Sequence, residues 1–167
     1  MNVIYIHGHA ASPKCFDFIR KHLDDDDEIL MEYDSGCGFF NNYEIMLERL
    51  SDIDDIVFIA HSLGGIYALH LTNCLPDKVL GAITLSTPYE GCIEAGMLQY
   101  LLPFNPVFQD IHPSSTLIAT ANKFEVRHPW TNVVTTCGGL PFIFEQNDGV
   151  VTHASMCHRK DISLVEV

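Results

Sequence analysis

Short apolar runs alternate along this chain with longer stretches of helical periodicity. Ile56-Val57-Phe58-Ile59 is one such run, and it has the length and composition of a buried strand. The pattern predicts strands at 2–6, 28–33, 56–60, 79–86, 133–137 and 162–167. It predicts helices at 14–23, 42–51, 64–74, 92–101 and 152–159, and a Pro-bearing loop at 103–115. Because strands and helices alternate, we expect an α/β fold, a mostly parallel sheet with helices on both faces.

Composition narrows the class of protein. The chain has 167 residues, of which 47% are hydrophobic and 19% charged, so we expect one globular domain spanning 1–167. The net charge of −13 argues against nucleic acid or an anionic membrane as a partner, because both would repel it. No apolar run reaches membrane-spanning length and no signal-type segment precedes the first strand, so a cytoplasmic protein without membrane insertion is the default expectation, with a secreted mature form as the alternative.

Several local features carry weaker signals. The six cysteines lack the C-x-x-C spacing of a metal site, and Cys74 and Cys137 are expected to be reduced core residues. The acidic run 24–28 lacks the alternation and the glycine of a calcium loop, which favours a solvated turn. His7 and His9 are not a metal-ligand set without further partners. We therefore predict neither a metal nor a cofactor.

The second predicted helix carries a capping signal. Asn41 and Glu44 have the spacing of an N-cap residue and the third helical residue after it. We therefore expect the helix to begin just after Asn41.

The most informative segment is Ala60-His61-Ser62-Leu63-Gly64-Gly65, which joins a predicted strand to a predicted helix. This layout is typical of a nucleophile elbow, where a strained serine sits at the apex of a tight turn. The positions two before and two after the serine must then be small, and they are Ala60 and Gly64. The following helix directs its first N–H groups at the serine. The alternative is a strand-to-helix turn with an incidental serine. We expect the elbow to turn His61 away from the reacting face.

Two further segments complete a hydrolase-like pattern. Gly8 follows the first strand and permits close backbone approach, so the N–H groups of His9 and Leu63 are predicted to form an oxyanion hole. Asp148 lies in an Asn-Asp-Gly segment after a late strand, the position expected for the acid of a triad. The alternative there is an ordinary Asn-Asp-Gly turn without chemistry.

With these segments the chain resembles the α/β-hydrolase superfamily, and most of all its small lipase and esterase branch. The matching segments are His7-Gly8-His9, Ala60-His61-Ser62-Leu63-Gly64-Gly65, Leu85-Ser86-Thr87-Pro88-Tyr89-Glu90-Gly91 and Asn147-Asp148-Gly149-Val150-Val151. The resemblance implies a three-layer α/β-hydrolase fold with Ser62 as nucleophile, Asp148 as acid and the oxyanion hole named above. It does not identify a substrate.

The base is where the sequence departs from the family pattern. The family's catalytic histidine follows the last strand, and here no residue lies beyond Val167. Three hypotheses remain: a shortened chain whose histidine lies on a missing tail, a short form that recruits another histidine, and a degenerate hydrolase that binds without turnover. For recruitment His153 is the first candidate and His158 the second, each against the alternative of a surface or helix-capping histidine.

The function predicted from the sequence is hydrolysis of carboxylic esters through an acyl-enzyme on Ser62, with a small ester or thioester as substrate. The alternatives are a non-catalytic binding protein on a hydrolase fold and an acyltransferase or thioesterase. The chain leaves room for at most a minimal lid, so short or medium acyl chains are expected. An exposed last strand would favour homo-oligomers. The side chains considered for an acyl site, with ordinary core as their alternative, are Phe39, Phe40, Tyr89, Leu98, Leu101, Leu102 and Phe104.

Overall fold

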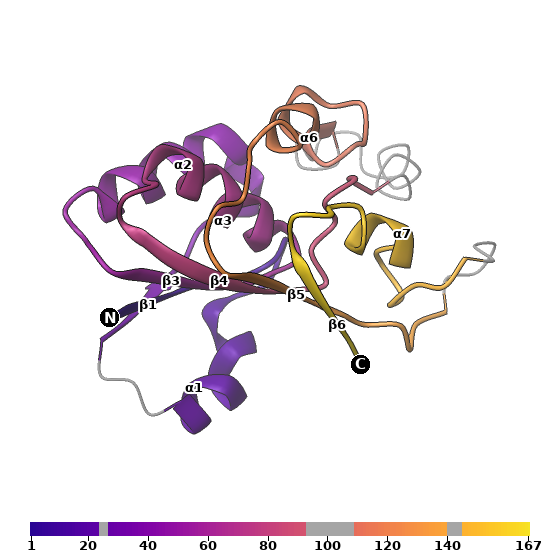
Figure 1. Cartoon of the computed structure of the whole chain (residues 1–167), viewed down its shortest axis with the longest axis horizontal. Helices are drawn as coiled ribbons and strands as arrows, with labels where there is room; N and C mark the ends of the chain where they lie inside the picture. Colours follow the sequence, from indigo (N-terminus) through magenta and orange to yellow (C-terminus); the bar gives the residue numbers. More distant parts are fainter. Residues whose placement is uncertain (24–26, 93–108, 140–144) are drawn as a thin grey trace.

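A single six-stranded parallel sheet runs through the molecule (Figure 1). The computed structural model describes residues 1–23, 27–92, 109–139 and 145–167. The strand order is β2-β1-β3-β4-β5-β6, and every neighbouring pair is parallel. The strands are β1 (Asn2–Ile6), β2 (Glu28–Met31), β3 (Ile56–His61), β4 (Val79–Leu85), β5 (Trp130–Val134) and β6 (Ser163–Glu166). All six predicted strands are present.

Helices cover both faces of this sheet. The α-helices of the described residues are α1 (Asp17–Leu23), α2 (Phe39–Leu50), α3 (Leu63–Cys74), α6 (Thr116–Ala121) and α7 (His153–Met156). Two short 3-10 helices, η1 (Pro13–Phe16) and η2 (Ser35–Cys37), precede α1 and α2. In Figure 1, α2, α3 and α6 lie on one face and α1 lies on the other, while α7 packs beside β5. This three-layer arrangement confirms the predicted fold class.

The core explains why α3 is apolar on every side. Each residue from Leu63 to Thr72 is buried, because α3 lies between the sheet and α2 and contacts α6 as well. Phe39, the first residue of α2, stacks on Tyr67 of α3 with ring centroids 4.1 Å apart. On the opposite face, Tyr5 and Ile59 pack against Phe16 from η1. Burial on both faces fixes the central strands and therefore also the strand ends, which carry the site.

Two elements begin three residues earlier than predicted, and one helix was not predicted. Asn41 is not a cap: α2 begins at Phe39 because that ring is 1% exposed and anchors the helix, with Gly38 at the N-cap. β5 begins three residues early, at Trp130, whose side chain is also buried. Helix α6 was not predicted, although Ser115 caps it by accepting a hydrogen bond from the Ile118 N–H.

The predicted burial of two cysteines is wrong. Cys74 and Cys137 are free thiols but exposed, not core residues. Cys74 is the last residue of α3, where its sulfur accepts a hydrogen bond from the Tyr43 hydroxyl at 2.8 Å. Outside the described residues lie 93–101 of the predicted helix at 92–101, 103–108 of the predicted loop at 103–115, and 24–26 of the acidic run 24–28.

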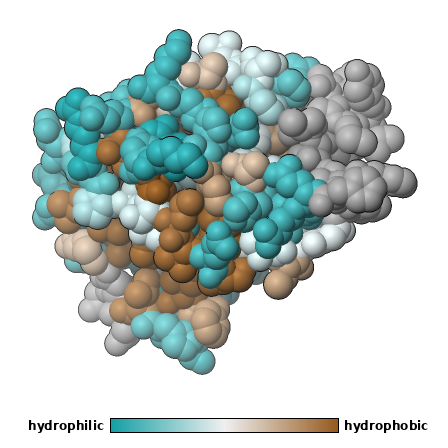
Figure 2. Space-filling model, turned by 45° about the vertical axis from the view of Figure 1, so that its right-hand side comes forward, coloured by the Kyte–Doolittle hydropathy of each residue, from teal (hydrophilic) through white to brown (hydrophobic). Residues whose placement is uncertain are grey.

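Apolar surface remains where the sheet is least covered. Ile83 of β4 and Val165 of β6 are 46% and 49% exposed, and every residue of the edge strand β6 is exposed. Figure 2 shows apolar side chains gathered in the lower half of the molecule. Among the described residues, no helix is both long and apolar enough to cross a membrane.

Candidate active site

Ser62 occupies a strained turn between β3 and α3. Its backbone angles are φ 51° and ψ −120°, in a region that residues other than glycine seldom adopt. The turn is held because the Ser62 N–H donates to the Leu85 carbonyl at 2.8 Å and the Ser62 carbonyl accepts from the Gly65 N–H at 3.0 Å. This geometry is that of an elbow, with the serine at the N-terminus of a buried helix.

Close packing joins the elbow to the loop after β1. A Cβ atom placed on Gly8 would lie 3.0 Å from Nδ1 of His61 and 3.1 Å from Cβ of Ser62. A Cβ atom on Gly64 would overlap the carbonyl oxygen of Ile6. Gly64 leaves no room for a side chain, and a side chain at Gly8 would force a shift of a few tenths of an ångström, so the loop that carries the His9 amide lies directly beside the serine.

One cavity of about 500 Å³ brings most of the predicted site together. Ser62 and Asp148 both line it, and so does His9 from the loop after β1. The full lining is His9, His61, Ser62, Ser86, Thr135, Cys137, Asp148, Val150 and Val151. These residues follow β1, β3, β4 and β5, whose carboxyl ends meet at one edge of the parallel sheet.

The Asp148 carboxylate is held by three donors. Oδ1 accepts from the N–H groups of Val150 and Val151, at 2.9 and 2.7 Å. Oδ2 accepts from the Thr135 hydroxyl at 3.2 Å, and that hydroxyl is 2.6 Å from the Ser86 hydroxyl. The carboxylate therefore has a fixed orientation at the cavity wall.

Sequence reasoning missed Thr135 and Ser86 as parts of the site. Ser86 has a backbone φ of 50°, the same unusual region as Ser62, and its N–H donates to the Val133 carbonyl at 2.9 Å. The only signal for them was their position along the chain. Ser86 directly follows β4 and Thr135 directly follows β5, and these two strands are neighbours in the sheet.

Two histidines line the cavity beside the serine. Burial lowers the pKa of His9. Burial also lowers the pKa of His61, and the Asp148 carboxylate partly opposes that shift. That the elbow turns His61 away from the reacting face stays a prediction: the residue contributes to the cavity lining, and Nδ1 of its ring is buried against Gly8 without a hydrogen-bond partner in the described residues. Both imidazoles are therefore neutral at pH 7.

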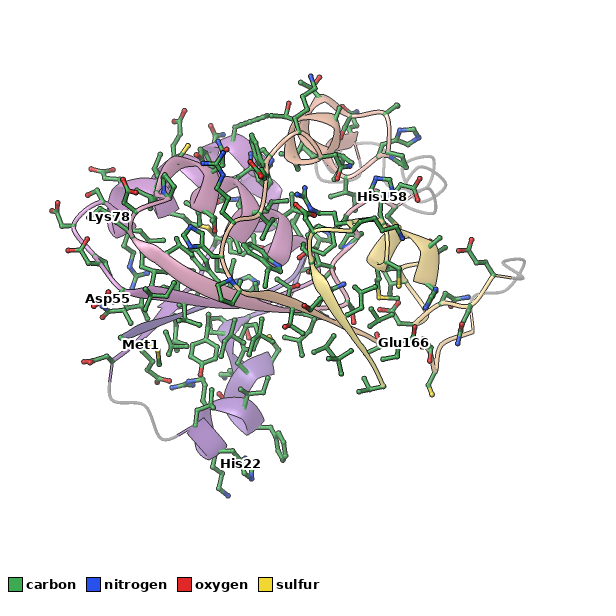
Figure 3. The ribbon with its side chains drawn as sticks, in the orientation of Figure 1. Met1, His22, Asp55, Lys78, His158 and Glu166 are labelled. Carbon is green, nitrogen blue, oxygen red and sulfur yellow. The ribbon has the colours of Figure 1, made fainter. Side chains whose placement is uncertain are left out.

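The two histidines proposed as base lie elsewhere. His153, at the start of α7, has Nε2 3.1 Å from Oε1 of Glu166 and 3.5 Å from Sγ of Cys157. Nδ1 of His158 lies 3.7 Å from a carboxylate oxygen of Glu90. Figure 3 shows His158 and Glu166 on different sides of α7. Within the described part of the chain, no imidazole is hydrogen-bonded to Ser62.

The apolar side chains considered for an acyl site do not line this cavity where they are described. Phe39 and Tyr89 are fully buried core residues, and Phe40 is 54% exposed on α2. The other four, Leu98, Leu101, Leu102 and Phe104, lie outside the described residues. The apolar part of the described cavity wall comes instead from Val150 and Val151.

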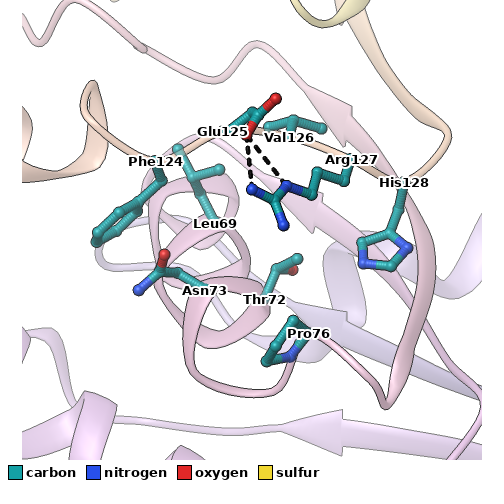
Figure 4. A pocket seen from close by; sticks show the side chains of 9 residues that line it. All are labelled: Leu69, Thr72, Asn73, Pro76, Phe124, Glu125, Val126, Arg127 and His128. Atoms are coloured by element: carbon teal, nitrogen blue, oxygen red, sulfur yellow. Dashed lines mark hydrogen bonds and ion pairs between the residues drawn. The ribbon is translucent and has the colours of Figure 1, made fainter.

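A second, smaller cavity lies at the other end of α3 (Figure 4). It has a volume of about 220 Å³, between the last turns of α3 and the segment that leads into β5. Its charged groups, Glu125 and Arg127, are paired with each other at 2.9 Å and are more than 70% exposed. It holds neither Ser62 nor Asp148, so it is separate from the site.

Solved structures share this fold although their sequences are distant. No protein-family model matches the sequence, and no curated protein does. A monoacylglycerol lipase from Paleococcus ferrophilus is 15% identical, with a TM-score of 0.65 over 99% of this chain and 83% of its own. A lipase from Bacillus licheniformis is 14% identical, with a TM-score of 0.67 over 98% and 81%. The phospholipase PlaB from Legionella pneumophila is 16% identical, with a TM-score of 0.70, and here 93% of this chain covers only 44% of the other. This chain has the α/β-hydrolase fold.

Proposed function

We propose that this protein hydrolyses carboxylic esters, with Ser62 as the nucleophile. The observation that carries the proposal is the elbow: Ser62 sits in a strained turn at a helix N-terminus and shares one cavity with the anchored carboxylate of Asp148. Strain of this kind costs stability and is typical of functional sites.

The proposed reaction has two stages. The Ser62 oxygen attacks the ester carbonyl while its proton passes to an imidazole, and that proton then leaves with the alcohol. The oxyanion accepts hydrogen bonds from the N–H groups of Leu63 and His9. Leu63 suits this role because it is the first residue of α3, where an N–H has no acceptor within the helix. Water then releases the acid from the acyl-enzyme.

Two histidines are compared as the base, His61 and His153. His61 lines the cavity and lies in the electrostatic field of Asp148, and its lowered pKa keeps it in the neutral form that accepts a proton. His153 would have to leave Glu166 and turn toward Asp148. We therefore propose His61 as the acceptor. If His153 is the base instead, His153→Gln and not His61→Gln will abolish reaction at Ser62.

The size of the cavity supports small substrates. A volume of about 500 Å³ lies within the range of ordinary small-molecule sites. Val150 and Val151 supply its apolar wall. Short or medium acyl esters and thioesters are the proposed class, so turnover should fall from butyrate to palmitate esters. A steady rise over that series would contradict this assignment.

Labelling by a fluorophosphonate, read by intact mass, tests the proposal directly. The probe reacts with a serine that is activated by a base and an oxyanion hole. We expect one adduct on the wild type, none on Ser62→Ala, and one on Ser51→Ala, a control at an exposed serine. An adduct that persists in Ser62→Ala would refute the assignment of the nucleophile.

The absence of an imidazole bound to Ser62 among the described residues favours one rival, a binding protein on the hydrolase fold. No adduct on folded wild-type protein, together with saturable binding of an ester or its acid, would support that rival and overturn hydrolysis.

A further inference from the structure

Three potential metal ligands converge outside the cavity, where the predicted base His153 lies. They are His153 at the start of α7, Cys157 just after that helix, and Glu166 in the edge strand β6. One ligand atom from each lies within 4.8 Å of the other two. Glu166 is labelled in Figure 3, near the end of β6 and close to α7. The proposed hydrolysis does not use this cluster.

The two distances from His153 match the edges of a tetrahedral zinc site, and the Cys157 sulfur and the Glu166 oxygen lie within 4.8 Å of each other. Zinc bonds of 2.0–2.1 Å to nitrogen and 2.3 Å to sulfur place those two ligand atoms about 3.6 Å apart, and nitrogen and carboxylate oxygen about 3.3 Å apart. In this structure Nε2 of His153 lies 3.5 Å from the Cys157 sulfur and 3.1 Å from the Glu166 oxygen. A single ring nitrogen that faces both groups has the arrangement of a ligand in a coordination shell.

Charge and exposure fit the same ion. A thiolate and a carboxylate together balance a divalent cation, and a neutral imidazole completes a set of ligands that zinc favours. The side chains of His153 and Glu166 are 29% and 62% exposed, which leaves an open direction for a water ligand. We propose that His153, Cys157 and Glu166 bind Zn²⁺ or a similar divalent transition metal. On binding, the Cys157 S–H bond is replaced by a metal–sulfur bond and the proton leaves to solvent.

The site would join two segments that share few other contacts. β6 is otherwise attached through its pairing with β5, and all its residues are exposed. α7 follows directly on the loop of Asp148, and the His153 N–H donates to the Gln146 carbonyl at 2.8 Å. A metal ion would therefore attach the edge strand to the segment that carries the acid of the proposed site.

Cobalt is the probe, because a thiolate bound to Co²⁺ gives a charge-transfer band in the near ultraviolet. Metal-free full-length protein should bind one Co²⁺ with this band and lose it when Zn²⁺ is added. Cys157→Ser should abolish the band, and Glu166→Gln should weaken binding about tenfold or more. Cys15→Ser, at another exposed free thiol, and His22→Gln, at another histidine, should bind as the wild type does.

A second readout guards against misfolded variants. Zn²⁺ should raise the thermal midpoint of the wild type by mass action and leave that of Cys157→Ser unchanged. Circular dichroism should be the same for both proteins, since the substituted side chain is only half-buried. The proposal is wrong if the wild type shows no thiolate band, or if the band survives in Cys157→Ser. Neither readout depends on hydrolysis.

Discussion

Acid should destabilise this protein through His70, a buried histidine of α3. Its side chain is 7% exposed, and Nε2 is buried without a hydrogen-bond partner in the described residues. The rings of Phe39 and Phe124 pack against it edge-on, with centroids 5.1 and 5.0 Å away, and Tyr43 lies at 6.0 Å. Burial lowers the pKa of His70 to about 4, from an ordinary value of 6.5.

The direction and size of the effect follow from proton linkage. As the pH falls, the unfolded chain binds the proton on His70 before the folded protein does. The stability is therefore complete above pH 6.5 and is lost progressively between 6.5 and about 4. Between pH 7 and pH 5, these two pKa values correspond to a loss of about 2 kcal/mol in the free energy of unfolding.

Urea unfolding at pH 7 and pH 5 measures this loss. His70→Phe keeps a ring of similar size and removes the titration, so the variant should lose about 2 kcal/mol less than the wild type over the same pH range. Comparing the two proteins cancels the contribution of His9 and His61, which titrate in both. Equal losses in wild type and variant would show that His70 is not the group responsible.

Three further substitutions test the site and its support. Gly8→Ala places a Cβ atom at 3.0 and 3.1 Å from its neighbours, which should displace the loop by a few tenths of an ångström and slow probe labelling by up to about 100-fold, the effect of losing one oxyanion donor. An unchanged labelling rate would mean that the His9 amide is not a donor. Thr135→Val removes one hydrogen-bond donor to Asp148, so probe labelling should slow about fivefold, equivalent to about 1 kcal/mol of activation free energy, while the thermal midpoint stays unchanged. A lower thermal midpoint without a change in the labelling rate would make Thr135 purely structural. Arg159→Met should lower the free energy of unfolding, measured by urea denaturation, by about 3 kcal/mol, because this buried guanidinium is hydrogen-bonded to Asp161 and to two backbone carbonyls. A loss below about 0.5 kcal/mol would contradict a stabilising role for Arg159.

The features that could be predicted from the sequence are those that depend on near neighbours. The elbow at Ser62 was recognisable because a buried strand, small flanking residues and an apolar helix are adjacent in the chain. The hydrogen bond from the Thr135 hydroxyl to Asp148 was not recognisable, because it depends on how the strand ends meet across the sheet. The placement of His153 also escaped prediction: Glu166, thirteen residues away, engages its ring. Helix α6 was missed because Thr116 and its β-branched neighbours suit a strand as well as a helix.

The glycine contacts divide the site into a part that cannot change and a part that can. Gly64 allows no side chain against the end of β1, so the serine and the amides beside it shift together or not at all. On the opposite wall Gly138 is equally confined, because a Cβ atom there would overlap the Gly149 nitrogen, but the side chain of Val150 is 62% exposed and can be exchanged without such an overlap. Selection for a different substrate would therefore accumulate substitutions on that wall, and the stretches around Gly8 and Ser62 would stay nearly constant among related sequences.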